Sequence, residues 1–220
     1  MSTWIQRLRS VAREWVNTET GLIGAIGAWV LKQACLDATC WPEEVGIAVN
    51  ISAVQFRSRS LVLDVAAALG ASNLRPSRLE LEITESVMLH DTGAVIDTLQ
   101  KLRSMGVKIV MDDFGTGYSS LAYLTRFAFD KVKIDRSFVR GIVDQNDCLA
   151  IVRAITSLCS SLNIPTTAEG VETDAQLQRL RNENCTEAQG YLLGRPLPVE
   201  AVKATLARYP NENIGAIAIA

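Results

Sequence analysis

Polar side chains that can bind a cation or move a proton recur through the middle of this 220-residue sequence. Each follows a short run rich in β-branched and apolar residues, where a strand would end. Their positions, 50, 82, 112, 135, 169 and 189, approach the repeat of about 31 residues expected for each unit of an eight-unit βα barrel. The residues are Asn50, Glu82 with Glu85, Asp112 with Asp113, Lys133 with Asp135, Glu169 with Glu172, and Gln189.

Carboxylates gathered at one end of a parallel sheet would repel one another. At 4 Å and an effective dielectric constant near 20, each like-charged pair costs about 4 kcal/mol. Such a cluster must take up protons, pair with lysine, or bind divalent cations. An all-oxygen donor set favours Mg²⁺, Mn²⁺ or Ca²⁺ over zinc. The adjacent pair Asp112 and Asp113 suits two bridged metals, as used in phosphoester cleavage. The alternative is that strand ends are polar only because they meet water.

The segment DDFGTGYSS at residues 112–120 is the most distinctive stretch of the sequence. Gly115 and Gly117 permit a tight loop after a strand, and Tyr118 with the two serines after it can begin a helix. The D-F-G triplet also occurs in protein kinases. No glycine-rich nucleotide loop or H-R-D-like segment accompanies it here, so a kinase is excluded.

The elements that must position these residues alternate between strands and helices. Strands are expected over residues 46–51, 78–83, 107–111, 131–134, 164–168 and 186–191. Helices are expected over residues 26–39, 58–69, 91–105, 146–162, 174–182 and 199–209, with Asp91 and Asp174 as N-caps and Gly106 after a helix. This pattern predicts an α/β fold with a parallel sheet. Six strands, in a chain about 30 residues shorter than a typical barrel, predict a modified (β/α)8 TIM-type barrel that is incomplete at its N-terminal side.

Composition excludes several other classes of protein. Hydrophobic residues make up 48% of the chain and charged residues 21%, with a net charge of −2, so bulk attraction to DNA is not expected. His90 is the only histidine, which excludes multi-histidine metal sites. The five cysteines form no C-x-x-C pair and indicate reduced thiols in the cytoplasm. The longest apolar run, residues 21–31, is too short for membrane insertion.

Several longer stretches together resemble the EAL domain of bacterial cyclic di-GMP signalling, in order and spacing, over about 180 residues. They are ETGLI (19–23), WVLKQAC (29–35), VNISAVQF (49–56), LELEITES (79–86), MDDFGTGYSSL (111–121), KVKIDRSFV (131–139), AEGVET (168–173) and QGYLLGRPLP (189–198). The resemblance implies a metal-dependent phosphodiesterase that linearises cyclic di-GMP to pGpG on a modified (β/α)8 barrel.

The resemblance also implies a role for each polar strand end. One metal would be held by Asn50, Glu82 and Asp112, and a second by Asp112, Asp113 and Glu169. The ions would be Mg²⁺ or Mn²⁺, with Ca²⁺ inhibitory. Lys133 would orient the attacking water, with Glu169 as a candidate general base, and Asp135 and Gln189 would lie at the edge of the site. Coupling to dimerisation would involve Glu85, Phe114, Gly115, Thr116, Gly117, Tyr118, Ser119 and Glu172. Alternatively, Glu85 and Glu172 are solvated or capping acids, and Asp135 pairs with Lys133 or Arg136.

The tripeptide Glu-Ala-Leu that names the family occurs nowhere in these 220 residues, nor does the arginine that follows it in the family. In the family, the glutamate binds the first metal and the arginine contacts a substrate phosphate. Residues 1–18 instead show apolar residues at three- and four-residue intervals, as in an amphipathic helix. We therefore expect a non-family segment (1–18), a barrel domain (19–209) and a C-terminal tail (210–220), with a weakened first metal site.

Three interpretations remain open at this point. The chain is a cyclic di-GMP phosphodiesterase with a truncated or misplaced start and with weak or no activity, a non-catalytic cyclic di-GMP receptor, or a protein-interaction module. Retention of Asp112, Asp113 and Lys133 together favours the first. The loss of two strands would also open the barrel and expose edges that a homodimer or another partner would have to cover.

Overall fold

The computed structural model describes residues 22–58, 60–88, 92–117 and 121–206. Its centre is a parallel sheet with strand order β1-β2-β3-β4-β5-β6. The strands are β1 (Ile47–Ile51), β2 (Leu79–Thr84), β3 (Lys108–Phe114), β4 (Lys131–Ile134), β5 (Thr166–Glu169) and β6 (Glu187–Gln189). The longer helices are α2 (Leu22–Ala38), α4 (Leu61–Ser72), α6 (Thr92–Ser104), α9 (Asn146–Ser161), α10 (Asp174–Asn182) and α11 (Val199–Leu206). Shorter helices are α3 (Ala53–Arg57), η1 (Pro76–Arg78), α5 (Glu85–Met88), α7 (Leu121–Arg126) and α8 (Arg136–Gly141).

Alternation along the strands gives the sheet an apolar outer face and a polar inner face. On β2, Leu79, Leu81 and Ile83 are at most 1% exposed and belong to the hydrophobic core. Glu80 and Glu82 lie between them, and successive side chains of a strand point to opposite faces. The inner face of the sheet is therefore the face that carries the charged residues.

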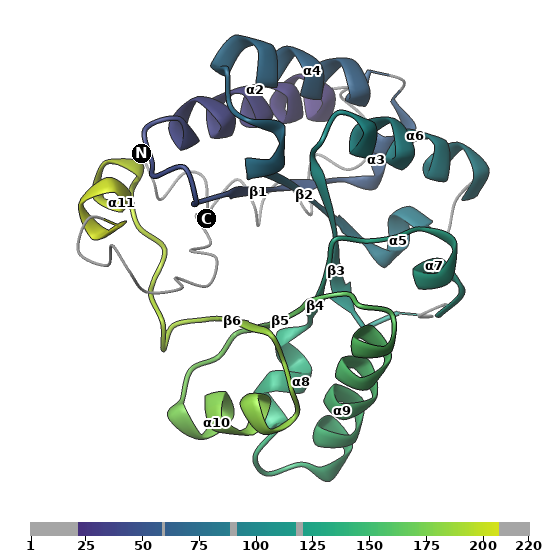
Figure 1. The fold of residues 1–220 in the computed structure, drawn as a ribbon, viewed down its shortest axis with the longest axis vertical. Coiled ribbons are helices and arrows are strands. Elements are labelled where there is room, and N and C mark those ends of the chain that lie inside the picture. Colours follow the sequence, from purple (N-terminus) through teal and green to yellow (C-terminus); the bar gives the residue numbers. More distant parts are fainter. Residues whose placement is uncertain (1–21, 59, 89–91, 118–120, 207–220) are drawn as a thin grey trace.

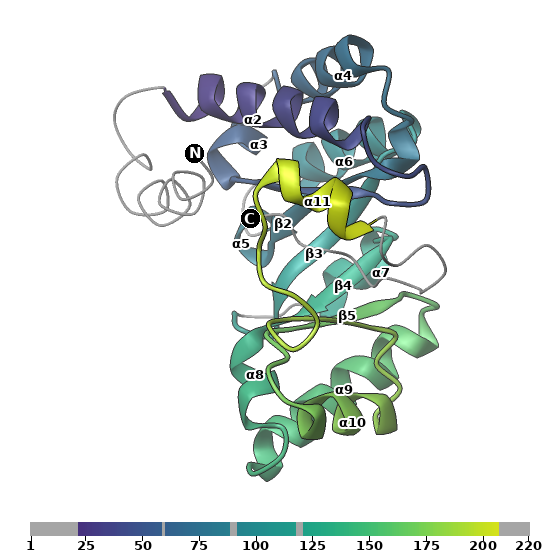
Figure 2. The ribbon, with the colours of Figure 1, turned by 90° about the vertical axis from the view of Figure 1, so that its left-hand side faces the viewer.

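The sheet curves into half of a barrel. Figure 1 shows the strands along an arc, with α2, α4, α6, α7, α9, α8 and α10 on its outer side and an opening between β1 and β6. Helix α11 lies on this open side, toward the β1 end of the sheet, as Figure 2 also shows. Among the described strands, β1 and β6 each have only one neighbour. The predicted fold, a TIM-type barrel of which about six strands are present, is confirmed.

Most element boundaries lie within a few residues of the sequence predictions, and the differences have local causes. Helix α10 begins at Asp174 as predicted, but the N-cap is Thr173, whose side chain accepts from the Gln176 amide in a capping box. Gly106 follows α6 with a φ of 90°, as expected for a C-terminal glycine. The predicted N-cap Asp91, His90 and the segments 1–18 and 210–220 lie outside the described residues.

All five cysteines lie within the described residues and are free thiols there. Burial raises the pKa of Cys35 and of Cys159 to about 11. Both thiols are therefore protonated at neutral pH and act as core residues rather than as metal ligands.

In the part of the chain that the structure describes, no helix has both the length and the apolar character needed to cross a membrane.

Candidate metal centre

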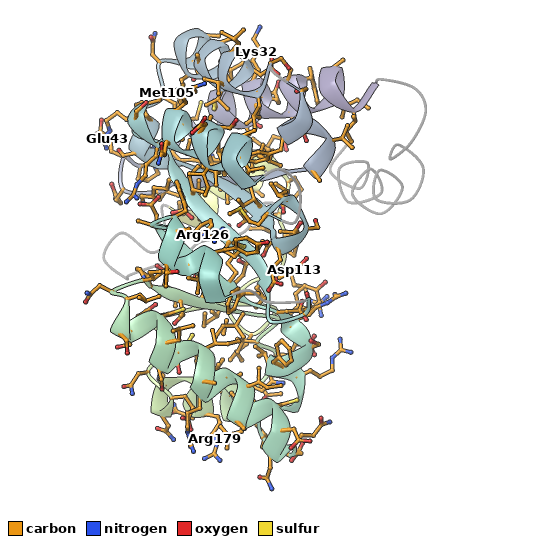
Figure 3. All side chains as sticks on the ribbon, turned by 90° about the vertical axis from the view of Figure 1, so that its right-hand side faces the viewer. Lys32, Glu43, Met105, Asp113, Arg126 and Arg179 are labelled. Atoms are coloured by element: carbon orange, nitrogen blue, oxygen red, sulfur yellow. The ribbon has the colours of Figure 1, made fainter. Side chains whose placement is uncertain are left out.

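The polar ends of the strands gather at one side of the half-barrel. In Figure 3, Glu43 and Met105, which precede β1 and β3, lie on one side of the molecule, and Asp113 near the end of β3 lies on the other. Carboxylate oxygens of Asp112, Asp113 and Glu169 all lie within 4.8 Å of one another. The polar side chains at the ends of β3 and β5 therefore lie close together, as the sequence predicted for the strand ends.

Lys133 lies at the centre of this acidic group. Its Nζ is 2.8 Å from Glu82 Oε1, 3.3 Å from Asp112 Oδ1 and 2.5 Å from Glu169 Oε1. The side chains of Lys133, Glu82 and Asp112 are each less than a tenth exposed. One ammonium group therefore connects β2, β3, β4 and β5 inside the half-barrel.

Burial and charge act in opposite directions on these groups. Burial works to lower the pKa of Lys133, but Glu82, Asp112 and Glu169 outweigh it and hold that pKa above its usual value. Burial also raises the pKa of Glu169, and the negative charges of Asp112 and Glu82 add to this effect against the attraction of Lys133. One lysine thus offsets only part of the negative charge of the cluster.

Asp112 and Asp113 are neighbours in sequence, so a regular strand would turn their side chains to opposite faces. The register prevents this, because Met111 pairs with Val132 and Phe114 pairs with Ile134, which places three steps of β3 against two of β4. Asp113 occupies the extra position with a φ of 54°, in the left-handed region. This bulge brings both carboxylates to the same mouth.

The backbone of Asp113 leads to a prediction about stability. A left-handed conformation costs an ordinary L-residue about 1 kcal/mol, and glycine escapes this cost. We expect Asp113→Gly to be about 1 kcal/mol more stable than Asp113→Ala in urea unfolding, while both lose cation affinity. Both variants remove the same charge, so their difference isolates the backbone. Equal stabilities would contradict the role of the bulge.

Glu85 anchors the loop that follows β3. Its Oε1 accepts a hydrogen bond of 2.8 Å from the backbone N–H of Gly115. A Cβ on Gly117 would lie 2.8 Å from Glu85 Oε2, so glycine is needed for this close approach. Phe114 is buried, and the hydroxyl of Thr116 donates to the Asp113 carbonyl at 2.8 Å. Glu85 therefore contacts the loop at Gly115 and Gly117. The coupling of this loop to dimerisation stays a prediction, and Tyr118 and Ser119 lie outside the described residues.

The other predicted residues lie at the rim of the site. Asn50 pairs in register with Glu82, and Gln189 pairs with Glu169, so both stand beside members of the cluster. Asp135 accepts a hydrogen bond from the Ser137 amide at 2.9 Å and caps α8. The side chain of Glu172 is exposed. Asn50 and Gln189 thus neighbour members of the acidic cluster, and Asp135 caps a helix.

A second layer of charges lies beneath the first and was not predicted as a unit. Lys131 Nζ is 3.3 Å from Glu80 Oε2 and 2.8 Å from Glu187 Oε2, which connects β4 to β2 and to β6. Thr167 donates a hydrogen bond of 2.8 Å to Glu187. The alternation of the sequence places residues 131 and 133 on the same face of their strand. It does not indicate that Glu187, on the three-residue strand β6, is a partner of Lys131.

The acidic group fits a divalent cation. The Oδ1 atom of Asp112 is buried and has no hydrogen-bond partner among the described residues, although it lies 3.3 Å from Lys133 Nζ. Two oxygens on opposite sides of Mg²⁺ are about 4.2 Å apart, and of Ca²⁺ about 5 Å apart, which matches the spread of the Asp112, Asp113 and Glu169 oxygens. Hard oxygen ligands of this kind select Mg²⁺, Mn²⁺ or Ca²⁺.

The half-barrel with an acidic cluster at one side defines the chain as a domain of the TIM-barrel class. The sequence profile of the EAL domain matches residues 16–196, and the chain belongs to the EAL domain family.

Among its curated relatives is MucR of Pseudomonas aeruginosa, a bifunctional diguanylate cyclase/cyclic di-GMP phosphodiesterase, which is 47% identical over 193 residues. This match covers 86% of the chain and 28% of MucR. The chain spans about a quarter of the length of the curated relatives that it matches.

Solved structures show the same fold. The PaMucR phosphodiesterase in its c-di-GMP complex has a TM-score of 0.82 and 45% identity, covering 90% of this chain and 79% of that one. BlrP1 of Klebsiella pneumoniae, in a complex with calcium and cyclic di-GMP, has a TM-score of 0.75 and 30% identity, covering 82% of this chain and 46% of that one. BlrP1 was also solved with manganese, at a TM-score of 0.72.

Proposed function

We propose that residues 19–209 form an EAL-type domain that binds cyclic di-GMP through divalent cations and hydrolyses it weakly to pGpG. The observation that carries this proposal is the gathering of Asp112, Asp113 and Glu169 around one point, with Lys133 among them. The complexes of PaMucR and BlrP1 with the cyclic dinucleotide support the choice of ligand. The cations would be Mg²⁺ or Mn²⁺, held by Asn50, Glu82, Asp112, Asp113 and Glu169.

The negative charge of the site determines what the cations and the side chains would each contribute to binding and hydrolysis. A cyclic dinucleotide carries two phosphate charges, and the carboxylates at the mouth would repel it unless cations were bound. When bound, the cations neutralise the phosphate and lower the pKa of a water molecule that attacks phosphorus. Lys133 would orient that water, and Glu169 would be the candidate general base that accepts its proton. Gln189, which pairs in register with Glu169, would lie at the edge of the site beside the nucleotide.

Weak turnover is expected because one ligand of the first cation is missing from the 220 residues. A hard cation bound by Asn50, Glu82 and Asp112 alone has two carboxylates instead of three. The phosphate-contacting arginine of the family is also absent from the sequence. Binding of the nucleotide can survive these losses better than hydrolysis, because hydrolysis needs both cations in place.

The test is calorimetric titration of the 220-residue chain with cyclic di-GMP in Ca²⁺, followed by chromatographic assay of pGpG in Mn²⁺. We expect binding in Ca²⁺, no binding in EDTA, and slow hydrolysis in Mn²⁺. Absence of binding in Ca²⁺ would reject the proposal in favour of an interaction module. Turnover close to that of a complete EAL phosphodiesterase would contradict the weakening of the first cation site.

A receptor without hydrolysis is the second candidate, and the missing glutamate is the observation that favours it. Binding in Ca²⁺ together with no detectable pGpG after prolonged incubation in Mn²⁺ would establish it. A second copy or a partner that pairs with the edges of β1 and β6 that no described strand covers is compatible with both candidates. The five free cysteines fit a reducing compartment, so we place the domain in the cytoplasm.

A further inference from the structure

Helix α2 (Leu22–Ala38) is apolar on every side. Its sequence, LIGAIGAWVLKQACLDA, contains a single short polar stretch and one aspartate. The helix packs against α4, β1 and α3, and Figure 1 shows it between α4 and β1. On the packed side, Leu31, Cys35 and Ala38 are completely buried. A helix that is hydrophobic all round belongs in a place where it is covered all round, so α2 should have a second cover.

The opposite side of α2 carries large apolar side chains that the described residues leave uncovered. Trp29 is 55% exposed and Leu36 is 37% exposed, and Ile26 is half-buried. With about 100° of rotation per residue, positions 26, 29 and 36 share one face of the helix. Trp29 is two residues from Leu31 and therefore points away from the packed side. We call Ile26, Trp29 and Leu36 the outer face of α2.

Residues 1–18 have the sequence pattern that fits this outer face. They directly precede α2, and Trp4, Leu8, Val11 and Trp15 recur at three- and four-residue intervals, which is the period of a helix with one apolar stripe. Residues 207–220 also lie outside the described residues, but their IGAIAIA stretch alternates with the period of a strand. The N-terminal segment is therefore the better match for a helix face.

The lengths also fit two antiparallel helices side by side. As a helix, residues 3–16 would measure about 21 Å, against about 25 Å for the 17 residues of α2. The polar stretch NTETG at 17–21 would form the turn, and about two to five residues are usual between such helices. In this arrangement Val11 would lie beside Trp29, so that a small side chain faces a large one.

We propose that residues 1–18 fold back along α2 as a helix and cover its outer face. The partner of this surface is then a segment of the same chain. Because α2 packs on β1, the docked segment would also support the first strand of the half-barrel, which lies at its open side. This inference goes beyond the proposed function and does not depend on the cation centre.

The test is limited digestion of the 220-residue chain with trypsin, followed by mass spectrometry. Trypsin cleaves after arginine, and the segment contains Arg7, Arg9 and Arg13. A docked helix must leave its site before a protease can cleave it. We therefore expect cleavage at these sites to be at least about tenfold slower in the chain than in a synthetic peptide of residues 1–18.

A pair of substitutions on α2 tests the outer face itself. Trp29→Gln combined with Leu36→Gln should remove most of the protection and raise the cleavage rate about tenfold, because the segment loses its apolar contacts. The matched control is Val143→Gln combined with Ile151→Gln, since these apolar side chains are 47% and 37% exposed at and before α9. The control should cleave at the wild-type rate.

A reciprocal pair on the segment, Leu8→Gln combined with Val11→Gln, keeps the test decisive if the α2 pair fails to fold. It should raise the cleavage rate as much as the α2 pair does, and the two pairs together should add nothing to either alone. Thermal unfolding gives a second readout. The α2 pair should lower the melting temperature by about 5 °C and the control pair by less than about 2 °C.

Two results would overturn this inference. One is cleavage of the segment as fast in the chain as in the free peptide. The other is equal cleavage rates for the α2 pair and the control pair. Protection that disappears when the chain is diluted would assign the outer face to a second copy and would likewise overturn it. None of these results bears on nucleotide binding in Ca²⁺, which tests the proposed function separately.

Discussion

Replacing Asp112 with asparagine is expected to weaken Mn²⁺ binding by about 100-fold or more. Asp112 contacts Lys133, is the most buried member of the group of three with Asp113 and Glu169, and has a buried Oδ1 atom directed into that group. Asparagine keeps the shape of the side chain and one oxygen, but it removes a charge from a site for a hard cation. Loss of groups that only support metal ligands already costs 10–100-fold in affinity, so the loss of a ligand charge should reach the upper end of that range.

The measurement is calorimetric titration with Mn²⁺, and Asp144→Asn is the control, because Asp144 is an exposed aspartate outside the site. The melting temperature without metal should change little, since Asp112→Asn weakens one ion pair but also reduces repulsion among the carboxylates. Glu82→Gln should weaken Mn²⁺ binding less than Asp112→Asn, because Glu82 lies outside the group of three. If Asp112→Asn binds Mn²⁺ as the wild type does, the cation site is elsewhere.

The half-barrel itself could be predicted from the sequence because its signals are local. Leu79, Leu81 and Ile83 alternate with Glu80 and Glu82, which identifies the strand and its two faces. The side of the sheet that carries the site followed from the same pattern, since parallel strands end on one side.

The position of Asp113 could not be predicted in this way. Alternation places Asp112 and Asp113 on opposite faces, and only the register of β3 against β4 produces the bulge that unites them. Register between strands depends on packing of the whole sheet rather than on a short stretch of sequence. The partners of Lys133 could not be predicted either, because they lie on other strands. Repulsion within a cluster of acids can be relieved by protonation, by pairing with lysine or by metal binding, and the sequence does not distinguish these three.

The short helices were missed for a different reason. Helix α3 has only five residues, too few for an apolar period to be recognised. Its N-terminus nevertheless carries a signal in the sequence, since Ser52 and Gln55 form a capping box. The same S/T-x-x-Q spacing at Thr173 and Gln176 gives the correct cap of α10. Capping boxes would therefore have improved the prediction of helix starts in this chain.

Removing Lys131 from the second layer of charges is expected to destabilise the half-barrel by several kcal/mol. Lys131 connects Glu80 on β2 with Glu187 on β6 across the inner face, and the side chains of Lys131 and Glu80 are each 12% exposed. Breaking a buried pair by removing one partner costs about 3–5 kcal/mol, because the remaining charges stay buried without compensation. We expect Lys131→Met to lower the free energy of unfolding in urea by about 3 kcal/mol.

Lys108 provides a matched control, because it pairs with the same Glu80 at 3.4 Å while its side chain is 48% exposed. An exposed pair is worth about 0–1 kcal/mol, so Lys108→Met should cost less than about 1 kcal/mol. Burial works to lower the pKa of Lys131, but Glu80 and Glu187 outweigh it and raise that pKa above the usual 10.5. The difference between wild type and Lys131→Met should therefore be fully present at neutral pH and shrink only above about pH 10.5. Equal losses for the two variants would show that the connection from β2 to β6 does not hold the half-barrel together.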